Sequence, residues 1–444
     1  MNILFTEMEH QNLQFMKKLV EDGHTVYTQQ HQNPNYLKSF GINSITDLPY
    51  FHQWTPEEVE YQTHNLNTTP KNTFEIFPKV LEKYKIDLVI NTFPSFNKLI
   101  HEKDWGVEII TCSPDAIKLE TEKLFARKFA HHCGMKLPKM LQSGNNHDTD
   151  LSLQDLPNKF IVKPQIRWIR AWVVSHKISF DAHGSKLWKS PYPIEYYCEE
   201  FIEGLETNIS YIMSDGKWSF TFSEHCDESN AKLAIVGEGP HAWYVNTTVE
   251  QLTPEVDKMV RDNVVDYLDS AAKLGGTYEG SITQMLGKDG ELYFIENNCR
   301  PYVQNSFPLP LGGNEYLDAF KNNPQKIGDC FTDKKFPKLV FQGKNAFKPS
   351  SECKYPFHLH NKYNIAEPTS VEIIDGEYIA QNGAVIIVFE DEINMDFVNE
   401  VEKESELKAY WGNWDIKSYK YNRINKKVFY QRTNKRGDNY VFMG

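Results

Sequence analysis

The run Glu291–Arg300 constrains this chain more than any other, because three polar side chains alternate at its end. Its apolar and aromatic residues are typical of a strand. Since side chains alternate along a strand, Glu296, Asn298 and Arg300 are expected on one face. Carboxylate and amide oxygens are ligands that Mg²⁺ shares with phosphates, and arginine binds anionic groups. The run therefore predicts a site for a magnesium-bound nucleoside triphosphate.

A second strand is expected just upstream, over Ser281–Leu286, with a tight hairpin turn at Lys288–Gly290 between the two. Pairing of the two strands would bring Gln284 and Glu296 to the same ion. The alternative is that Gln284 is an ordinary polar residue of a strand. Both interpretations of Gln284 are open from the sequence.

Two earlier segments also suit a nucleotide. In Lys159–Pro164, Lys163 closes an apolar run and Pro164 forces the strand to end or bend, so the lysine is placed to reach a phosphate. The segment Tyr196–Glu206 joins a short apolar run to an acidic cluster interrupted by Gly204. A hinge of this kind offers backbone groups to the edge of an adenine.

Taken in this order, the segments resemble the ATP-grasp fold, and within it the glycinamide ribonucleotide synthetase (phosphoribosylamine–glycine ligase) family. The resemblance covers residues 1–310 and is faint beyond, at 380–386. Further segments carry the resemblance: Asn2–Phe5, Glu9–His10 with a helix ending at Gly23, Ile86–Asn91, Cys112–Lys123 and Lys128–Pro138. The last of these is expected to be a helix closed by Gly134 in the left-handed cap position.

The resemblance assigns roles to residues of the nucleotide site. It implies that Lys123 and Lys163 contact the phosphates and that Glu206 binds the ribose hydroxyls. The residues implied at the adenine are Glu200, Phe201 and Ile202.

The resemblance also implies that Glu296 and Asn298 are magnesium ligands, to which the strand pairing adds Gln284. Arg300 lies beside them, and the resemblance makes Arg300 and Lys163 the residues that act on the transferring phosphoryl group. The implied cofactors are ATP and Mg²⁺ or Mn²⁺.

Three segments depart from the family pattern. Thr6–Met8 stands where the family has a glycine-rich phosphate loop, so a ribose-phosphate substrate is not expected there. Gln165–Trp172 replaces a glycine-rich lid, with Arg167 or Arg170 as candidate phosphate contacts. Pro301–Ser306 replaces a glycine-aspartate-proline-glutamate run, which predicts a changed acceptor pocket.

The fold class implied by the resemblance is α/β, with α+β lobes. We expect an N-terminal doubly wound, Rossmann-like domain over 1–112, an ATP-grasp domain over 113–325 with a lid at about 124–197, and a β-rich domain over 326–444. The length of 444 residues fits several cores. Asn322–Pro349 is interpreted as a linker, and strands are predicted at 371–374, 384–388 and 427–430.

Composition limits the other function classes. Forty-eight basic against sixty acidic residues give a net charge of −12, which disfavours a nucleic acid as the main partner but leaves a local basic groove open. Seven cysteines without Cys-x-x-Cys spacing argue against a disulfide scaffold and a structural zinc site. His358 and His360 are expected as a surface pair on one strand face. Residues 1–20 predict neither a signal peptide nor a membrane span, so a cytoplasmic location is expected.

The leading functional hypothesis is an ATP-dependent carboxylate–amine ligase that forms an amide through an acyl phosphate, as in purine biosynthesis. The resemblance implies a small amino acid such as glycine as the carboxylate, and small-molecule carboxylate and amine substrates as partners. Two alternatives remain open. One is a non-catalytic nucleotide-binding or scaffold protein, and the other is a ligase that attaches an amino acid to a nucleic acid or other macromolecule.

Overall fold

The computed structural model of the chain describes residues 1–6, 12–29, 34–48, 71–92, 96–147, 156–157, 159–165, 172–175, 193–226, 254–301, 309–332, 338–343, 352–368, 371–380, 384–390, 392–410, 415–422, 427–433 and 439–443. The departures at Thr6–Met8, Gln165–Trp172 and Pro301–Ser306 lie largely outside these ranges, as do Arg167 and Arg170.

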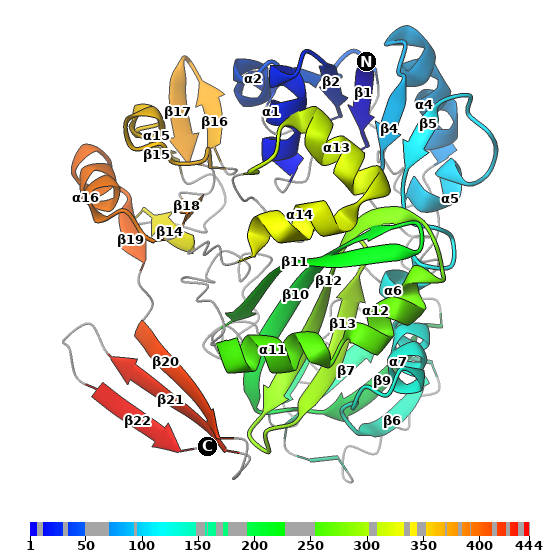
Figure 1. The fold of residues 1–444 in the computed structure, drawn as a ribbon, viewed down its shortest axis with the longest axis vertical. Helices are drawn as coiled ribbons and strands as arrows, with labels where there is room; N and C mark the ends of the chain where they lie inside the picture. Colours follow the sequence, from blue (N-terminus) through cyan, green and yellow to red (C-terminus); the bar gives the residue numbers. More distant parts are fainter. Residues whose placement is uncertain are drawn as a thin grey trace.

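The N-terminal part is a five-stranded parallel sheet in the order β3-β2-β1-β4-β5. It stands at the top of Figure 1 with its helices around it. Its elements are β1 (Asn2–Phe5), α1 (Leu13–Glu21), β2 (Thr25–Thr28), α2 (Pro34–Ser39), β3 (Asn43–Ser44), α4 (Lys71–Lys83), β4 (Leu88–Ile90), α5 (Asn97–Ile100) and β5 (Glu108–Ile110).

Successive residues of β1 pack into two different cores. Ile3 and Phe5 join the core that contains α1, whereas Leu4 joins the core that contains α4. A strand buried on both faces is what a parallel sheet covered by helices on each side requires. The expected doubly wound α/β arrangement is therefore confirmed.

A second, antiparallel sheet in the order β6-β9-β7-β8 follows, and we call it the lid sheet. The helix before it closes at Gly134, whose φ of +81° matches the predicted left-handed cap. The elements of this part are α6 (Lys118–Thr121), α7 (Lys123–His132), β6 (Met140–Asn145), β7 (Lys159–Pro164), β8 (Trp172–Ser175) and β9 (Glu195–Glu200).

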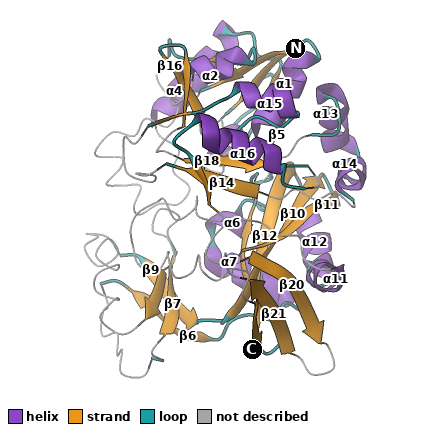
Figure 2. Cartoon of the chain, turned by 90° about the vertical axis from the view of Figure 1, so that its left-hand side faces the viewer, coloured by secondary structure: helices purple, strands orange, loops and turns teal. Residues whose placement is uncertain are grey.

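The third sheet, which we call the central sheet, is antiparallel in the order β11-β10-β12-β13. Figures 1 and 2 show it beside the lid sheet, below the N-terminal sheet. Its predicted hairpin turn forms, with Gly290 at a φ of +79°. The elements are β10 (Gly204–Ser214), β11 (Lys217–Cys226), α11 (Pro254–Asp262), α12 (Val265–Ala272), β12 (Thr277–Gly287) and β13 (Leu292–Asn298).

One face of the central sheet packs against α7, α11 and α12, and the other meets helix α13 (Gly313–Asn322) only at the end that carries Ile212 and Ser214. Ile209, Ile282 and Phe294 point into a core with α7, α11 and α12. The alternate residues of the same strands point the opposite way, because side chains alternate along a strand. We call this second face the polar face, since buried Asn208, Ser210, Ser281 and Thr283 lie on it.

The elements of residues 313–410 pack with the N-terminal sheet, whereas the strands of residues 415–443 form a sheet of their own, at the lower left of Figure 1. Residues of α1, α13 and the C-terminal strands share one hydrophobic core, and Figure 1 shows α13 and α14 between the N-terminal and central sheets. These elements are α13 (Gly313–Asn322), α14 (Pro324–Phe331), β14 (Lys338–Gln342), β15 (Cys353–Lys354), α15 (His358–Tyr363), β16 (Val371–Ile374), β17 (Glu377–Ala380), β18 (Ala384–Val388), α16 (Met395–Glu404), β19 (Lys408–Tyr410), β20 (Asp415–Asn422), β21 (Lys427–Thr433) and β22 (Asn439–Met443).

Two sequence predictions for this part are wrong. The supposed linker at 322–349 contains α14 and β14, because Pro324 occupies the first turn of a helix, where a missing N–H is no loss. His358 and His360 lie on helix α15 rather than on a strand, and His360 is buried with its Nε2 atom 2.5 Å from the Tyr355 hydroxyl. The three predicted C-terminal strands are present as β16, β18 and β21.

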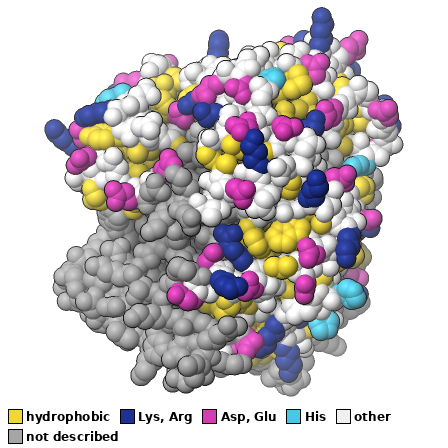
Figure 3. Space-filling view, viewed as in Figure 1, with side chains coloured by type: hydrophobic (Ala, Val, Ile, Leu, Met, Phe, Trp, Pro, Cys, Tyr) yellow, Lys and Arg dark blue, Asp and Glu magenta, His cyan; other side chains and the backbone are white. Residues whose placement is uncertain are grey.

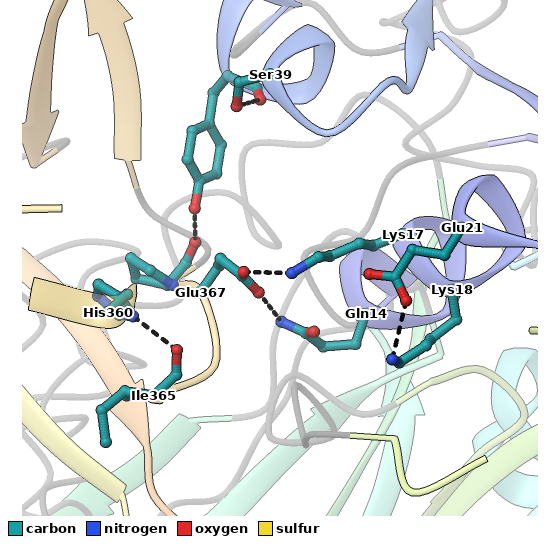
Figure 4. A network of polar contacts seen from close by, with 10 residues as sticks. Gln14, Lys17, Lys18, Glu21, Ser39, His360, Ile365 and Glu367 are labelled. Carbon is teal, nitrogen blue, oxygen red and sulfur yellow. Dashed lines mark hydrogen bonds and ion pairs between the residues drawn. The ribbon is translucent and has the colours of Figure 1, made fainter. Parts of the chain in front are cut away.

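Polar contacts attach the C-terminal part to α1, as Figure 4 shows. The Glu367 carboxylate pairs with Lys17 and accepts a hydrogen bond from Gln14 at 3.3 Å. These residues are half-buried or buried, so the contact is partly shielded from solvent. The start of α1 is thereby fixed from two sides, by the N-terminal core and by Glu367.

Candidate nucleotide and metal site

Lys163, at the end of β7, is buried beside a fully buried carboxylate of the neighbouring strand. Its Nζ atom lies 2.5 Å from Oε1 of Glu199, and Nη1 of Arg127 lies 2.8 Å from the other oxygen. Burial works against the lysine charge, but Glu199, with smaller contributions from Tyr197 and Glu296, more than compensates and holds the pKa of Lys163 above its ordinary value. The lysine is therefore charged at neutral pH although it is 5% exposed.

Lys163 also connects the lid sheet to the central sheet. Its Nζ atom donates to the Ile295 carbonyl at 3.1 Å. Ile295 is the extra residue of a β-bulge, since Thr283 pairs with Glu296 and the next residue pairs with Phe294. The bulge places the lysine next to the backbone of Glu296.

Lys123 is the first residue of α7 and lies close to the end of β7. The next backbone N–H, of Leu124, donates to the side chain of Gln165 at 3.1 Å, which ties the start of α7 to the residue after β7. Burial lowers the pKa of Lys123 to about 8, Glu296 opposes this decrease, and Lys163 adds to it. A helix N-terminus with a nearby lysine favours an anion such as phosphate.

Glu296 and Asn298 lie on the polar face of the central sheet, opposite Thr283 and Ser281. Glu296 is exposed, and its charge opposes the decrease in the pKa of Lys123 and contributes to the raised pKa of Lys163. The structure thus brings together Lys123, Lys163 and Glu296, as the sequence predicted.

Arg300 follows β13 and is held from α6. Its Nε–H donates to Oε1 of Glu120 at 2.7 Å. The arginine side chain is 25% exposed and the glutamate 6%, so the ion pair is largely screened from water.

Gln284 does not join the other predicted metal ligands, and its predicted convergence with Glu296 is wrong. Its side chain lies on the helix-covered face: Nε2 donates to the Val260 carbonyl at 3.2 Å, and Oε1 accepts from Asn263 at 2.5 Å. The physical reason is the bulge, which pairs Glu296 with Thr283 instead and leaves Gln284 on the opposite face.

The predicted hinge connects the lid sheet to the central sheet, between the end of β9 and the start of β10. A Cβ atom at Gly204 would lie 1.9 Å from the Leu286 carbonyl, so only glycine permits this close approach. Glu200 accepts the Lys139 backbone N–H at 2.7 Å. The Lys159 ammonium lies 3.5 Å from the ring centroid of Phe201.

The two other residues of the predicted hinge are Ile202 and Glu206. Ile202 is half-buried between β9 and β10. Glu206 is in β10, directly opposite Met285 of β12, on the polar face. Their roles at the adenine and the ribose remain predictions.

Sequence reasoning missed two carboxylates that organise the cations, Glu199 and Glu120. The signal for Glu199 was available, because a charged residue directly after buried Tyr197 and Cys198 requires a partner. Glu120 belongs to the Cys112–Lys123 segment that carries the resemblance, but its pairing with Arg300 had no signal, since Arg300 is remote in the sequence. Thr283 was missed because the bulge was not foreseen; its hydroxyl donates to Asn208 at 2.6 Å on the polar face.

The donor set suits a magnesium–phosphate group better than a metal held by protein alone. No group of three or more His, Cys, Asp or Glu side chains with metal-binding geometry occurs among the described residues. One carboxylate and one amide oxygen beside two lysines fit an ion whose other ligands are phosphate oxygens and water. Glu296 and Asn298 are the residues that would hold it.

Charge on the described part of the face in Figure 3 is not gathered into bands. On the face shown in Figure 3, basic and acidic side chains are interspersed over the described part of the chain. None of the helices that the structure describes is long and apolar enough to cross a bilayer.

Comparison with protein-family models gives no match, and neither does comparison with curated protein sequences. Solved structures do match. An L-amino acid ligase from Bacillus licheniformis superposes with a TM-score of 0.61 at 14% identity, over 93% of this chain and 99% of that one. A phosphoribosylamine–glycine ligase from Thermotoga maritima gives 0.56 at 12% identity, over 92% and 97%.

A third match is a biotin carboxylase from Campylobacter jejuni in complex with β-γ-ATP, with a TM-score of 0.58 at 12% identity, over 92% of each chain. These structures are ATP-grasp enzymes. The chain therefore has the ATP-grasp fold along most of its length, in a divergent form. The fold expected from the resemblance is confirmed.

Proposed function

We propose that this protein is an ATP-dependent ligase that activates a carboxylate and joins it to an amine. The observation that carries the proposal is the convergence of Lys123, Lys163 and Glu296 at the bulge where the lid sheet meets the central sheet. Two cations and a carboxylate at the junction of two sheets suit a metal-bound triphosphate. The ATP-grasp fold supports the same function.

In the proposed reaction a carboxylate oxygen of the substrate attacks the γ-phosphorus, the bond to ADP breaks, and ADP leaves. The amine then attacks the acyl carbon, orthophosphate leaves, and the amine loses a proton. Lys163 and Arg300 would neutralise the charge of the transferring phosphoryl group. Lys123 would bind the phosphates beside them, and no side chain has to act as nucleophile.

The cofactor site follows from the same residues. Glu296 and Asn298 would hold Mg²⁺ on the polar face of the central sheet, with phosphate oxygens as further ligands. When bound, the ion supplies charge neutralisation across the terminal phosphates. The hinge at Glu200, Phe201 and Ile202 would receive the adenine, and Glu206 the ribose.

We propose a small amino acid as the carboxylate substrate. Two of the structural neighbours support this choice, since one is a phosphoribosylamine–glycine ligase and the other an L-amino acid ligase. The amine is expected to differ from a ribose phosphate, because Thr6–Met8 lacks the glycines of a phosphate loop.

Hydroxylamine provides a test that needs no knowledge of the natural amine, because it captures an acyl phosphate as a hydroxamate. The protein is incubated with MgATP, hydroxylamine and each standard amino acid in turn, and ADP and hydroxamate are measured. We expect both products with at least one amino acid. Glu296→Gln should abolish them, whereas Glu102→Gln, an exposed position outside the site, should not.

The alternatives give different results in this assay. ADP without hydroxamate would show an ATPase and contradict the ligase proposal. MgATP binding without ADP formation on any substrate would favour the non-catalytic nucleotide-binding protein. The acidic net charge and the interspersed charge on the face shown in Figure 3 support small-molecule substrates over a nucleic acid.

A further inference from the structure

One carboxylate holds two consecutive residues at the end of β13. Oε1 of Glu120 accepts the Nε–H of Arg300 at 2.7 Å, and Oε2 accepts the backbone N–H of Cys299 at 2.9 Å. The glutamate side chain is 6% exposed. Charge-assisted hydrogen bonds of this kind are the strong ones, and shielding from water strengthens them. Glu120 therefore fixes both the bend of the backbone after β13 and the guanidinium beyond it.

The segment that carries Glu120 is itself fixed to β13 at a second point. The Cys299 thiol lies 3.3 Å from the Ala116 carbonyl, and the Asn297 amide donates to the same sulfur at 3.2 Å. Both Cys299 and Asn297 are buried. Segment 116–120 and the end of β13 therefore form one packed unit.

The same segment leads directly into Lys123. The chain leaves the helical conformation at Glu122, with φ −117° and ψ 86°, and α7 begins at Lys123. The residue that holds Arg300 is thus three positions from a lysine of the candidate site. A shift of α6 would move both cations together.

An arginine side chain loses rotamer entropy when its guanidinium is fixed, so a partner that already holds the guanidinium reduces the loss on binding a ligand. A bond to Nε orients the plane of the guanidinium. We infer that Glu120 is a positioning residue: through its bond to Nε, it directs the guanidinium of Arg300 toward the γ-phosphoryl group. The inference rests on the proposed function, since it takes a nucleoside triphosphate as the ligand.

The test is a binding experiment, so that it does not depend on knowing the amine or on turnover. The dissociation constants of magnesium-bound β,γ-imido-ATP and MgADP are measured by calorimetry, and their ratio reports contacts to the γ-phosphoryl group. The proteins are the wild type, Glu120→Gln, Arg300→Ala and the double variant. Glu120→Gln should lower the preference for the triphosphate by about tenfold. In the Arg300→Ala background, Glu120→Gln should alter the preference for the triphosphate by less than about twofold.

Glu122→Gln is the matched control, since it removes the same charge two residues away and should leave the preference within about twofold of wild type. The inference would be overturned if Glu120→Gln changed the preference for the triphosphate equally in the wild type and in Arg300→Ala, or in neither. Thermal unfolding verifies that each variant folds. If Glu120→Gln does not fold, Glu120→Asp, which keeps the charge on a shorter side chain, replaces it in the same comparison of single and double variants. Absence of nucleotide binding by the wild type would instead refute the proposed function.

Discussion

Glu199 is fully buried and lies between two cations, with Oε1 2.5 Å from the ammonium of Lys163 and Oε2 2.8 Å from the guanidinium of Arg127. A buried charge is tolerated only when it is paired and hydrogen-bonded. The carboxylate therefore keeps Lys163 charged at the position where the lid sheet meets the central sheet.

Glu199→Gln should destabilise the fold strongly, because it leaves two cations without their carboxylate. Breaking a buried pair costs about 3–5 kcal/mol. Urea unfolding measures the loss. The matched control is Glu203→Gln, which removes a solvent-exposed partner of Lys288 at 2.8 Å and should cost less than about 1 kcal/mol. Equal losses in both variants would contradict the role given to Glu199.

Binding of MgATP should take up a proton above pH 8. The pKa of Lys123 is lowered to about 8 in the free protein, so the side chain is largely neutral at pH 9, and a triphosphate favours its charged form. Calorimetry at pH 8.5 in buffers of different ionisation enthalpy measures the uptake. Lys123→Arg, which stays charged, should remove it. Proton uptake of the same size in Lys123→Arg would show that a group other than Lys123 takes up the proton.

The lowered pKa of Lys123 also makes the free energy of unfolding depend on pH. Between pH 8 and the ordinary value of 10.5, the unfolded chain holds more protons at Lys123 than the folded chain does. The contribution of this residue therefore makes the fold more stable as pH rises through that window. Urea unfolding of wild type and Lys123→Arg across the window should show a rise in the wild type that the variant lacks.

Gln284→Met should cost stability without affecting the nucleotide. The change leaves the Val260 carbonyl and the Asn263 amide without their partner, at a cost of about 1–3 kcal/mol. The Mg²⁺ dependence of ATP binding should be unchanged, whereas Glu296→Gln should raise the Mg²⁺ concentration required. A changed dependence in Gln284→Met would restore Gln284 as a ligand.

Gly204→Ala should disrupt the hinge. Its Cβ atom would lie 1.9 Å from the Leu286 carbonyl, so β10 and β12 would have to separate. We expect a loss of several kcal/mol or failure to fold. The control, Gly216→Ala, lies in the β10–β11 turn with open space around it and a φ of +91°, so it should cost about 1–2 kcal/mol. Similar thermal unfolding midpoints for the two variants would contradict this account.

The sequence was sufficient wherever local pattern determines structure. The alternation in Glu291–Arg300 placed Glu296 and Asn298 on one face, and Lys288–Gly290 gave the hairpin turn. Pro324 was misleading, because proline both breaks helices and begins them, and here it begins α14.

The sequence could not predict the register of β12 against β13, nor the pairing of side chains that are remote in the chain. One extra residue, Ile295, decides whether Gln284 or Thr283 shares a face with Glu296, and no local preference indicates such a bulge. The pairing of Glu120 with Arg300 depends on how α6 packs against β13. These contacts arise only when distant segments fold together.

The central claim is that a carboxylate is activated by phosphorylation, and isotope transfer tests it most directly. The protein is incubated with MgATP, hydroxylamine and standard amino acids whose carboxylates carry ¹⁸O, and the released orthophosphate is analysed by mass spectrometry. The account predicts one ¹⁸O atom per phosphate, because the oxygen that attacks the γ-phosphorus leaves with it. Phosphate released without the label would contradict the account.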